Sequence, residues 1–229
     1  MSEMKKEYIV DESAESKEVF EKRVAEIICA LKEKYQLDFT DRRIPESRIV
    51  ELLARIQNVF GSLENVRDKK ILDLGGGARI DKETLEIMEK IEEIDRDKNP
   101  LEYKRLENIL IEKGKYDVAT SDGEFEPWLS RALLELGAHP VVVDIGDNEG
   151  EEFEHYQRNL LESGALDFLA DKSFDGVIMS LLLNSPQLME KTSITEREKM
   201  KEELMKQIKR LLKDDGKEID VHGYIENAD

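Results

Sequence analysis

Three consecutive glycines after a short apolar run constrain the fold of this chain more than any other feature of its sequence. Residues 69–79 read KKILDLGGGAR, so the apolar run around Asp73 ends in Gly75, Gly76 and Gly77. A run without polar alternation is typical of a strand buried on both faces of a parallel sheet. The glycines predict a tight turn where another group can approach the backbone closely. Because ligands of open α/β sheets bind outside the carboxyl ends of the strands, we expect this turn to be a ligand loop.

The composition narrows the classes of function. The chain has 229 residues and a formal net charge of −18. A negatively charged protein surface repels the phosphates of nucleic acids, so we expect no nucleic-acid partner. Cys29 is the only cysteine, which excludes a disulfide framework and a cysteine-rich metal site, and we expect no metal. No apolar run reaches about 18 residues and no signal-peptide pattern is present, so we expect a cytoplasmic protein without a membrane partner.

Helical spacing of apolar residues precedes the glycine turn. Residues 1–66 are predicted to form an N-terminal helical cap, with helices over about 16–35 and 45–60. Gly61 is a suitable residue to end the second helix. The cap either covers one side of the sheet or closes over a substrate, and the sequence leaves both interpretations open.

A helical insertion is predicted after the turn, over residues 81–120. Within it, residues 81–115 have the pattern of a hairpin of two helices, interrupted at Asn99 and Pro100 and stopped at Gly114. Its charges are dense and of mixed sign, which is typical of a solvated face.

The remaining residues, within a predicted domain over 67–229, alternate between helices and strands. The predicted elements are a helix over 126–137, a strand over 141–144, a helix over 150–163, a short strand over 166–168, a strand over 174–180, a helix from 193 onward, a turn over 214–216 and a last strand over about 218–222. This alternation predicts an α/β fold, a doubly wound and mostly parallel sheet of about five strands.

The residues around the turn argue against a phosphate-bearing ligand. A phosphate loop needs a lysine after its last glycine, whereas Ala78 follows Gly77. The dinucleotide fingerprint needs a third glycine where Ile80 stands. The next helix begins with Asp81 and Glu83, and two like charges about 4 Å apart repel by roughly 4 kcal/mol at an effective dielectric near 20. A nicotinamide-dependent enzyme is therefore a weaker alternative.

Three motifs, taken in order, resemble the class I S-adenosylmethionine-dependent methyltransferases. They are residues 71–77 (ILDLGGG), 141–146 (VVVDIG) and 173–180 (SFDGVIMS). S-adenosylmethionine has a sulfonium, an ammonium and no phosphate, so carboxylates near the turn favour it. The resemblance covers residues 69–221 apart from the insertion, and it implies a Rossmann-like sheet with strand order 3-2-1-4-5.

The resemblance implies a set of cofactor-binding residues at the carboxyl ends of the strands. They are Asp73, Gly75, Gly76, Gly77, Asp144, Ile145, Asp167, Phe168, Ser180 and Leu181. Asp73 would lie near the methionine ammonium, and Asp144 would accept hydrogen bonds from both ribose hydroxyls. Ile145 and Phe168 would lie beside the adenine, whose amino group Asp167 would bind. The last two residues would face the methyl group. Asp144 and Asp167 also have a structural alternative, as acids in turns after strands.

The chain departs from the family pattern in three places. Arg79 stands where the family usually has another glycine, and the insertion separates the turn from its usual helix, which we place at 126–137. Few residues follow the fifth strand, so the usual sixth and seventh strands are not expected. The fifth strand would then be an edge, and it or the insertion offers a surface for an oligomer.

A weaker set of residues is predicted to line the acceptor pocket. It consists of Phe125, Trp128, Asn184 and His222. For Trp128, packing between helix and sheet is an equal alternative, and for His222 a surface position is the stronger one. Catalytic residues are not predicted, because methyl transfer is a direct displacement in which alignment supplies much of the rate.

The sequence therefore predicts an S-adenosylmethionine-dependent methyltransferase with a small-molecule or protein acceptor. The alternative is a non-catalytic binding or interaction protein that keeps the fold.

Overall fold

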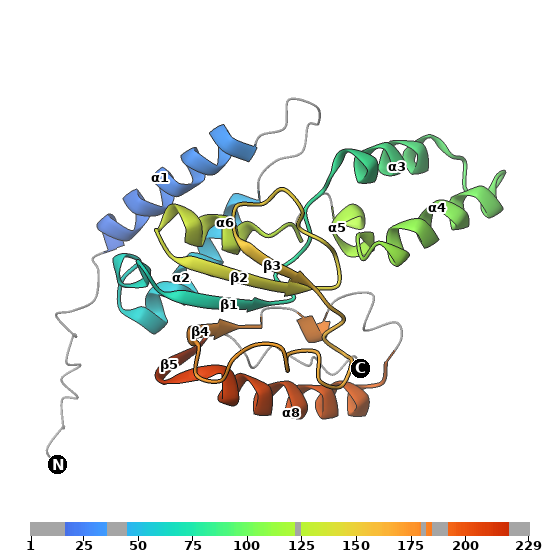
Figure 1. Ribbon diagram of the computed structural model, residues 1–229. Helices are drawn as coiled ribbons and strands as arrows, with labels where there is room; N and C mark the ends of the chain where they lie inside the picture. The colour runs from blue at the N-terminus through green and yellow to red at the C-terminus, as the bar shows by residue number, and fades with distance from the viewer. Residues whose placement is uncertain (1–16, 36–44, 122–124, 180–181, 185–191, 220–229) are drawn as a thin grey trace, which may run out of the picture.

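The computed structural model describes residues 17–35, 45–121, 125–179, 182–184 and 192–219, and these form an α/β fold (Figure 1). Five strands build one sheet in the order β3-β2-β1-β4-β5, with every neighbouring pair parallel, which confirms the predicted fold class and strand order. The strands are β1 (Lys70–Leu74), β2 (His139–Asp144), β3 (Glu154–Gln157), β4 (Phe174–Ile178) and β5 (Leu212–Ile219).

From β1 the chain adds strands first on one side (β2, β3) and then on the other (β4, β5), so the strand order switches between β1 and β4. Open α/β sheets bind ligands at this switch point. Leu74 pairs with Val143 on one side of β1, and Asp73 pairs with Ile178 on the other. The glycine turn therefore leaves the carboxyl edge of the sheet beside the last residues of β2 and β4.

Helices cover both faces of the sheet (Figure 1). On one face lie α1 (Lys17–Tyr35), α2 (Glu46–Phe60) and α6 (Trp128–Glu135), whose apolar side chains share a core with residues of β1, β4 and β5. On the other lies α8 (Ile194–Leu211), in a second core with β1, β2 and β4. The N-terminal helices thus cover one side of the sheet, which was the simpler of the two predicted roles.

The predicted insertion projects beside the carboxyl edge of the sheet (Figure 1). It contains α3 (Lys82–Glu93), α4 (Pro100–Glu112) and a short α5 (Tyr116–Thr120), with a small apolar core of its own. Asp81 caps α3 by accepting from the Thr84 amide at 2.7 Å. The break at Asn99 and Pro100 is confirmed, and Gly114 has a φ of 67°. The described residues also form 3-10 turns at Glu64–Val66 and Leu182–Asn184.

The predicted third strand and the helix before it are wrong. No helix forms over 150–163; the third strand is β3 inside that range, and residues 166–168 lie in turns. Phe153, Tyr156 and Leu160 have helical spacing, but β2 offers Glu154–Gln157 a row of unpaired backbone groups, and parallel pairing overrides the local pattern. The sequence EHYQ of this edge strand has no apolar run that would predict it.

The predicted start of the fifth strand is also wrong. β5 begins at Leu212, directly after α8, and includes residues 214–216, where a turn was predicted. The register explains both observations. Between the pairs Phe174–Leu212 and Gly176–Lys217, β4 advances by two residues and β5 by five, so the predicted turn residues form an irregularity within the strand. Residues 220–222 of the predicted strand lie outside the described residues.

Among the described residues, no helix is both long enough and apolar enough to cross a membrane.

Candidate functional site

Two acidic residues lie near the carboxyl ends of neighbouring strands, Asp73 in β1 and Asp144 in β2. Asp73 in β1 is 2% exposed, and its Oδ2 accepts a hydrogen bond from Ser130 Oγ of α6 at 3.1 Å. Burial raises the pKa of the Asp73 carboxyl to about 7; the Ser130 hydrogen bond opposes this rise, and the charge of Asp144 adds to it. Burial outweighs the stabilisation of the ionised form by Ser130 and by the charge of Arg48, so an added cation would favour that form.

Asp144 at the end of β2 holds the glycine turn against the turn that follows β2. Its Oδ2 accepts from the Gly77 amide at 3.1 Å, and its Oδ1 accepts from the Gly146 amide at 2.8 Å. Burial raises the pKa of Asp144 to about 6, although both backbone hydrogen bonds favour the ionised form. Each carboxylate oxygen retains a further lone pair, so Asp144 has capacity for two more donors.

Each glycine of the turn packs closely against atoms of this chain. A Cβ on Gly75 would lie 2.8 Å from the Leu182 side chain, and one on Gly76 would lie 2.5 Å from the Asp73 carboxylate. At Gly77, where φ is 97°, a Cβ would lie 2.0 Å from the carbonyl oxygen of Phe125. The tight turn is thus confirmed, and internal packing alone requires the glycines; their contact with a cofactor stays a prediction.

Asn148 joins the two turns and was not predicted from the sequence. Its buried amide accepts from the Arg79 backbone amide at 2.8 Å and donates to the carbonyl oxygen of Gly77 at 3.0 Å. Arg79 stands where the family pattern has another glycine, and its side chain donates to the carbonyl oxygen of Glu149 at 3.0 Å. The backbone amide and the guanidinium of Arg79 therefore both bind the end of the glycine turn to the turn after β2.

A buried arginine fixes the start of α6, the predicted displaced helix. Arg131 bonds to Glu126 and, at 2.6 Å, to Glu151, and all three side chains are at least nine-tenths buried. Its guanidinium also lies 4.3 Å from the ring centre of Tyr35 and 4.5 Å from that of Trp128. These contacts favour the packing interpretation of Trp128. No spacing rule identifies this network, because its members come from separate elements.

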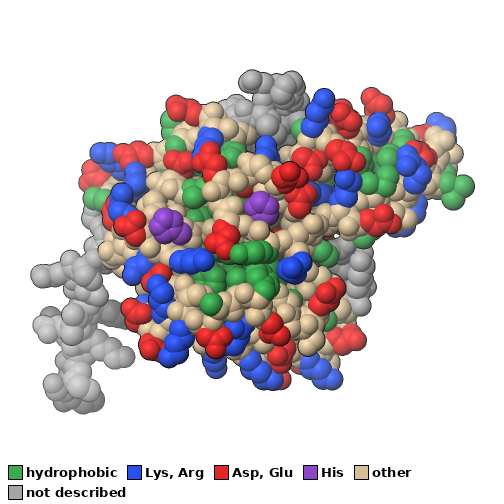
Figure 2. Space-filling view, in the orientation of Figure 1, with side chains coloured by type: hydrophobic (Ala, Val, Ile, Leu, Met, Phe, Trp, Pro, Cys, Tyr) green, Lys and Arg blue, Asp and Glu red, His purple; other side chains and the backbone are tan. Residues whose placement is uncertain are grey.

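The residues predicted beside the adenine are exposed apolar groups. Ile145, directly after Asp144, and Phe168 are each 43% exposed. Phe168 packs on Tyr156 of β3 with ring centres 4.5 Å apart. Figure 2 shows hydrophobic side chains gathered in the middle of the viewed face, between basic side chains and near both described histidines. Asp167 lies in a turn and donates its amide to the carbonyl oxygen of Gly164, so its expected place within a strand over residues 166–168 is wrong.

The other predicted residues are placed only in part. Phe125 is half-buried beside the glycine turn, with the Arg48 guanidinium 5.3 Å from its ring centre. Asn184 lies in the turn after β4, whose Leu182 contacts Gly75. Ser180, Leu181 and His222 lie outside the described residues. The structure therefore brings Asp73, Asp144, the glycines and Phe125 together, and it leaves Asp167 in a different local setting from the one expected.

Comparison with known proteins does not name a family. No protein-family model matches the chain, and no curated protein matches it. Among the described residues, no group of three or more His, Cys, Asp or Glu is placed to hold a metal ion.

Proposed function

We propose that the chain binds S-adenosylmethionine at the carboxyl ends of β1 and β2 and transfers its methyl group to a small-molecule or protein acceptor. The observation that carries this proposal is the pair of desolvated carboxylates, Asp73 and Asp144, on either side of a glycine turn. Burial raises both pKa values towards neutrality, so a site of this kind gains free energy from a cationic ligand.

The same carboxylates oppose a pyrophosphate. Backbone amides are the groups that usually bind phosphate at such a turn, but the Gly77 amide donates to Asp144 instead. The nearby ammonium of Lys115 bonds to backbone carbonyl oxygens. A phosphate-bearing ligand would meet two acidic groups, whereas a sulfonium and an ammonium would offset the acids.

The residues present fit the proposed cofactor. Asp144 would accept the ribose hydroxyls through its remaining lone pairs, Asp73 would lie towards the ammonium directly or through water, and exposed Ile145 would pack on the adenine. When bound, the cofactor supplies an electrophilic methyl group. The chain's own contribution is to orient that group and the acceptor, since a direct displacement depends on alignment.

A non-catalytic binding protein with the same fold is the second candidate. It is favoured by the packing of the glycine turn, because the groups closest to its three glycines belong to the chain itself. They are Leu182, Asp73 and Phe125. This candidate predicts cofactor binding without turnover, or no cofactor binding, together with a stable protein partner on co-purification.

The decisive experiment is calorimetric titration with S-adenosylhomocysteine, the demethylated product. We expect binding by the wild type, and a loss of about 1–3 kcal/mol in Asp144→Asn, because a charged acceptor of two hydroxyls is removed. Asp175→Asn is the matched control: Asp175 is a carboxylate of β4 that bonds to the Lys70 amide at 2.9 Å and to Lys213 at 2.8 Å.

Wild-type protein that does not bind at millimolar ligand would refute the cofactor assignment. Equal affinity in wild type and Asp144→Asn would remove Asp144 from the site. Competition with NAD separates the nicotinamide alternative, since NAD would then displace S-adenosylhomocysteine at low concentration.

A further inference from the structure

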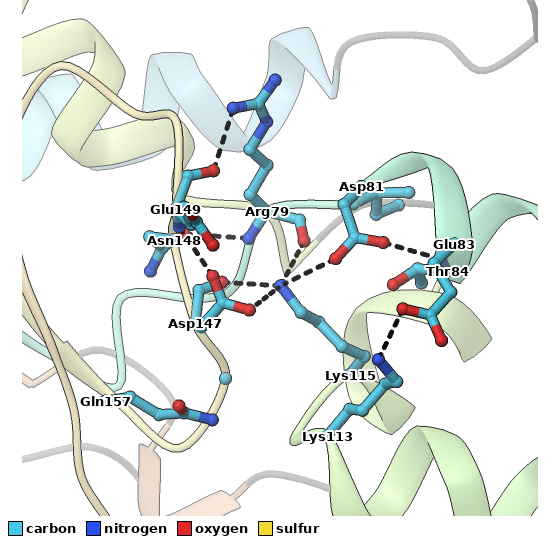
Figure 3. Close-up of polar contacts among 12 residues, drawn as sticks. Arg79, Asp81, Glu83, Thr84, Lys113, Lys115, Asp147, Asn148, Glu149 and Gln157 are labelled. Atoms are coloured by element: carbon cyan, nitrogen blue, oxygen red, sulfur yellow. Dashed lines mark hydrogen bonds and ion pairs between the residues drawn. The ribbon is translucent and has the colours of Figure 1, made fainter.

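Lys115 is buried where the end of the insertion meets the ends of β1 and β2. It is 1% exposed, and it is the only buried lysine among the described residues. Its Nζ donates to the carbonyl oxygens of Arg79 and Asp147, each at 2.6 Å. The carboxylates of Asp81 and Asp147 lie 3.9 and 3.7 Å from the same nitrogen. Figure 3 shows the ammonium surrounded by these oxygens, which come from two separate segments, residues 79–81 and Asp147.

The oxygens around Lys115 replace the water that its ammonium loses on burial. An ammonium without such partners would be strongly destabilising in this position. Burial lowers the pKa of Lys115, and the negative charges of Asp147, Asp81 and Asp144 oppose that change. The charged form is therefore stabilised while three segments are docked together: Lys115, residues 79–81 and Asp147.

The two carbonyl groups belong to the segments that hold Asp144. Asp144 accepts from the amides of Gly77 and Gly146. Arg79 follows Gly77 by two residues, and Asp147 directly follows Gly146. Lys115 thus bonds to each segment within two residues of a group that bonds to Asp144.

The three segments are also in close steric contact. A Cβ on Gly114, directly before Lys115, would lie 2.6 Å from the carbonyl oxygen of Ile145. A Cβ on Gly146 would lie 2.4 Å from the Cβ of Ala78. The insertion therefore packs against the turn after β2, and that turn packs against the glycine turn.

We propose that Lys115 is a positioning residue that couples docking of the helical insertion to the ligand site. With its ammonium in place, the glycine turn and the turn after β2 are held together, and Asp144 keeps both backbone donors. By linkage, a ligand bound at Asp144 stabilises the docked insertion by the same factor by which docking raises ligand affinity. The identity of the ligand rests on the proposed function, but the coupling is measurable without it.

Lys113 provides a matched control within the same hairpin. It pairs with Glu83 at 2.7 Å, on the surface. Lys115→Met and Lys113→Met each remove one ammonium, and only the first removes buried hydrogen bonds to the two turns.

The first experiment compares amide hydrogen exchange in the two variants. We expect Lys115→Met to raise exchange rates about tenfold or more over residues 75–81 and 144–148, and Lys113→Met to leave these peptides at wild-type rates. Affinity for S-adenosylhomocysteine should fall about tenfold or more in Lys115→Met and less than about twofold in Lys113→Met. Equal exchange over both turns in the two variants would overturn the proposal.

The second experiment uses the wild type, so it does not depend on folding of a variant. Lysines are trace-labelled with acetic anhydride, with and without saturating S-adenosylhomocysteine, and quantified by mass spectrometry. The coupling predicts a lower labelling rate at Lys115 with ligand and an unchanged rate at Lys113. An unchanged rate at Lys115 would overturn it. If S-adenosylhomocysteine does not bind the wild type, the proposed function fails, and the exchange comparison alone decides whether Lys115 holds the turns.

Discussion

Replacing Asp73 by Asn should change how the stability of this protein depends on pH. The pKa of Asp73 is raised from 3.8 to about 7 in the folded chain, mainly by burial. A raised carboxyl pKa means that the folded state binds a proton more tightly than the unfolded state, so stability falls as pH rises between the two pKa values. About three pKa units correspond to about 4 kcal/mol when both states are fully ionised.

The effect lies within an accessible pH range. Between pH 5.5 and 8, a site that titrates near 7 when folded and near 4 when unfolded loses about 2 kcal/mol of stability. Asn has nearly the same shape and does not titrate in this range. The free energy of unfolding of the wild type should therefore fall by about 2 kcal/mol relative to Asp73→Asn across this range, as measured by urea unfolding at constant ionic strength.

The control is again Asp175→Asn. The pKa of Asp175 is lowered: burial alone would raise it, but its hydrogen bonds to Lys213 and the Lys70 amide outweigh that effect. Its folded and unfolded values both lie below pH 5.5, so the difference between wild type and Asp175→Asn should stay constant from pH 5.5 to 8. If the free energies of unfolding of wild type and Asp73→Asn differ by the same amount at every pH, the pKa of Asp73 is not raised in the folded chain. The same conclusion follows if the wild type becomes more stable relative to Asp73→Asn as pH rises.

Three further predictions concern the ligand site and its support. Affinity for S-adenosylhomocysteine should rise from pH 5.5 to 8, and binding should release protons, because the ammonium of the ligand favours ionised carboxylates. Calorimetry in buffers of different ionisation enthalpy measures this release. Proton uptake on binding would instead indicate a site that favours anionic ligands. Gly77→Ala should lower the free energy of unfolding by about 3 kcal/mol or more, because the methyl group clashes with Phe125 and φ is positive. Gly61→Ala, where φ is 82° and no backbone atom is close, should lower it by only about 1–2 kcal/mol in urea unfolding. Equal losses in the two variants would argue against the clash. Arg131→Met should cost about 3–5 kcal/mol, because two buried glutamates lose the guanidinium that pairs with them. Arg105→Met on the surface of α4 should leave the unfolding midpoint unchanged, and a small effect of Arg131→Met would mean that water replaces the guanidinium.

The central strands could be predicted because their signal is local. Apart from Asp73, residues 71–74 and 141–143 are apolar, as expected of strands covered on both faces, and the structure buries them under helices on each side. The insertion was predictable for the same reason, since Asp81, Pro100 and Gly114 mark helix ends through their own backbone preferences.

The edge strands could not be placed in the same way. The four residues of β3 form a strand because β2 supplies the backbone partners, and their own sequence also fits a helix. In β5, the turn-forming residues 214–216 are accommodated by a register irregularity opposite β4. Pairing with a neighbouring strand decided both cases.

Local signals in the sequence predict the doubly wound sheet, the acid and glycines at its centre, and the position of the insertion, because hydrophobic periodicity and backbone preference act over a few residues. The contacts of the glycine turn depend instead on the assembled fold. It placed Asn148, Ser130 and Lys115 around the carboxylates. These contacts join segments separated by many residues, and burial, which sets the pKa values of the acids, is a property of the assembled fold.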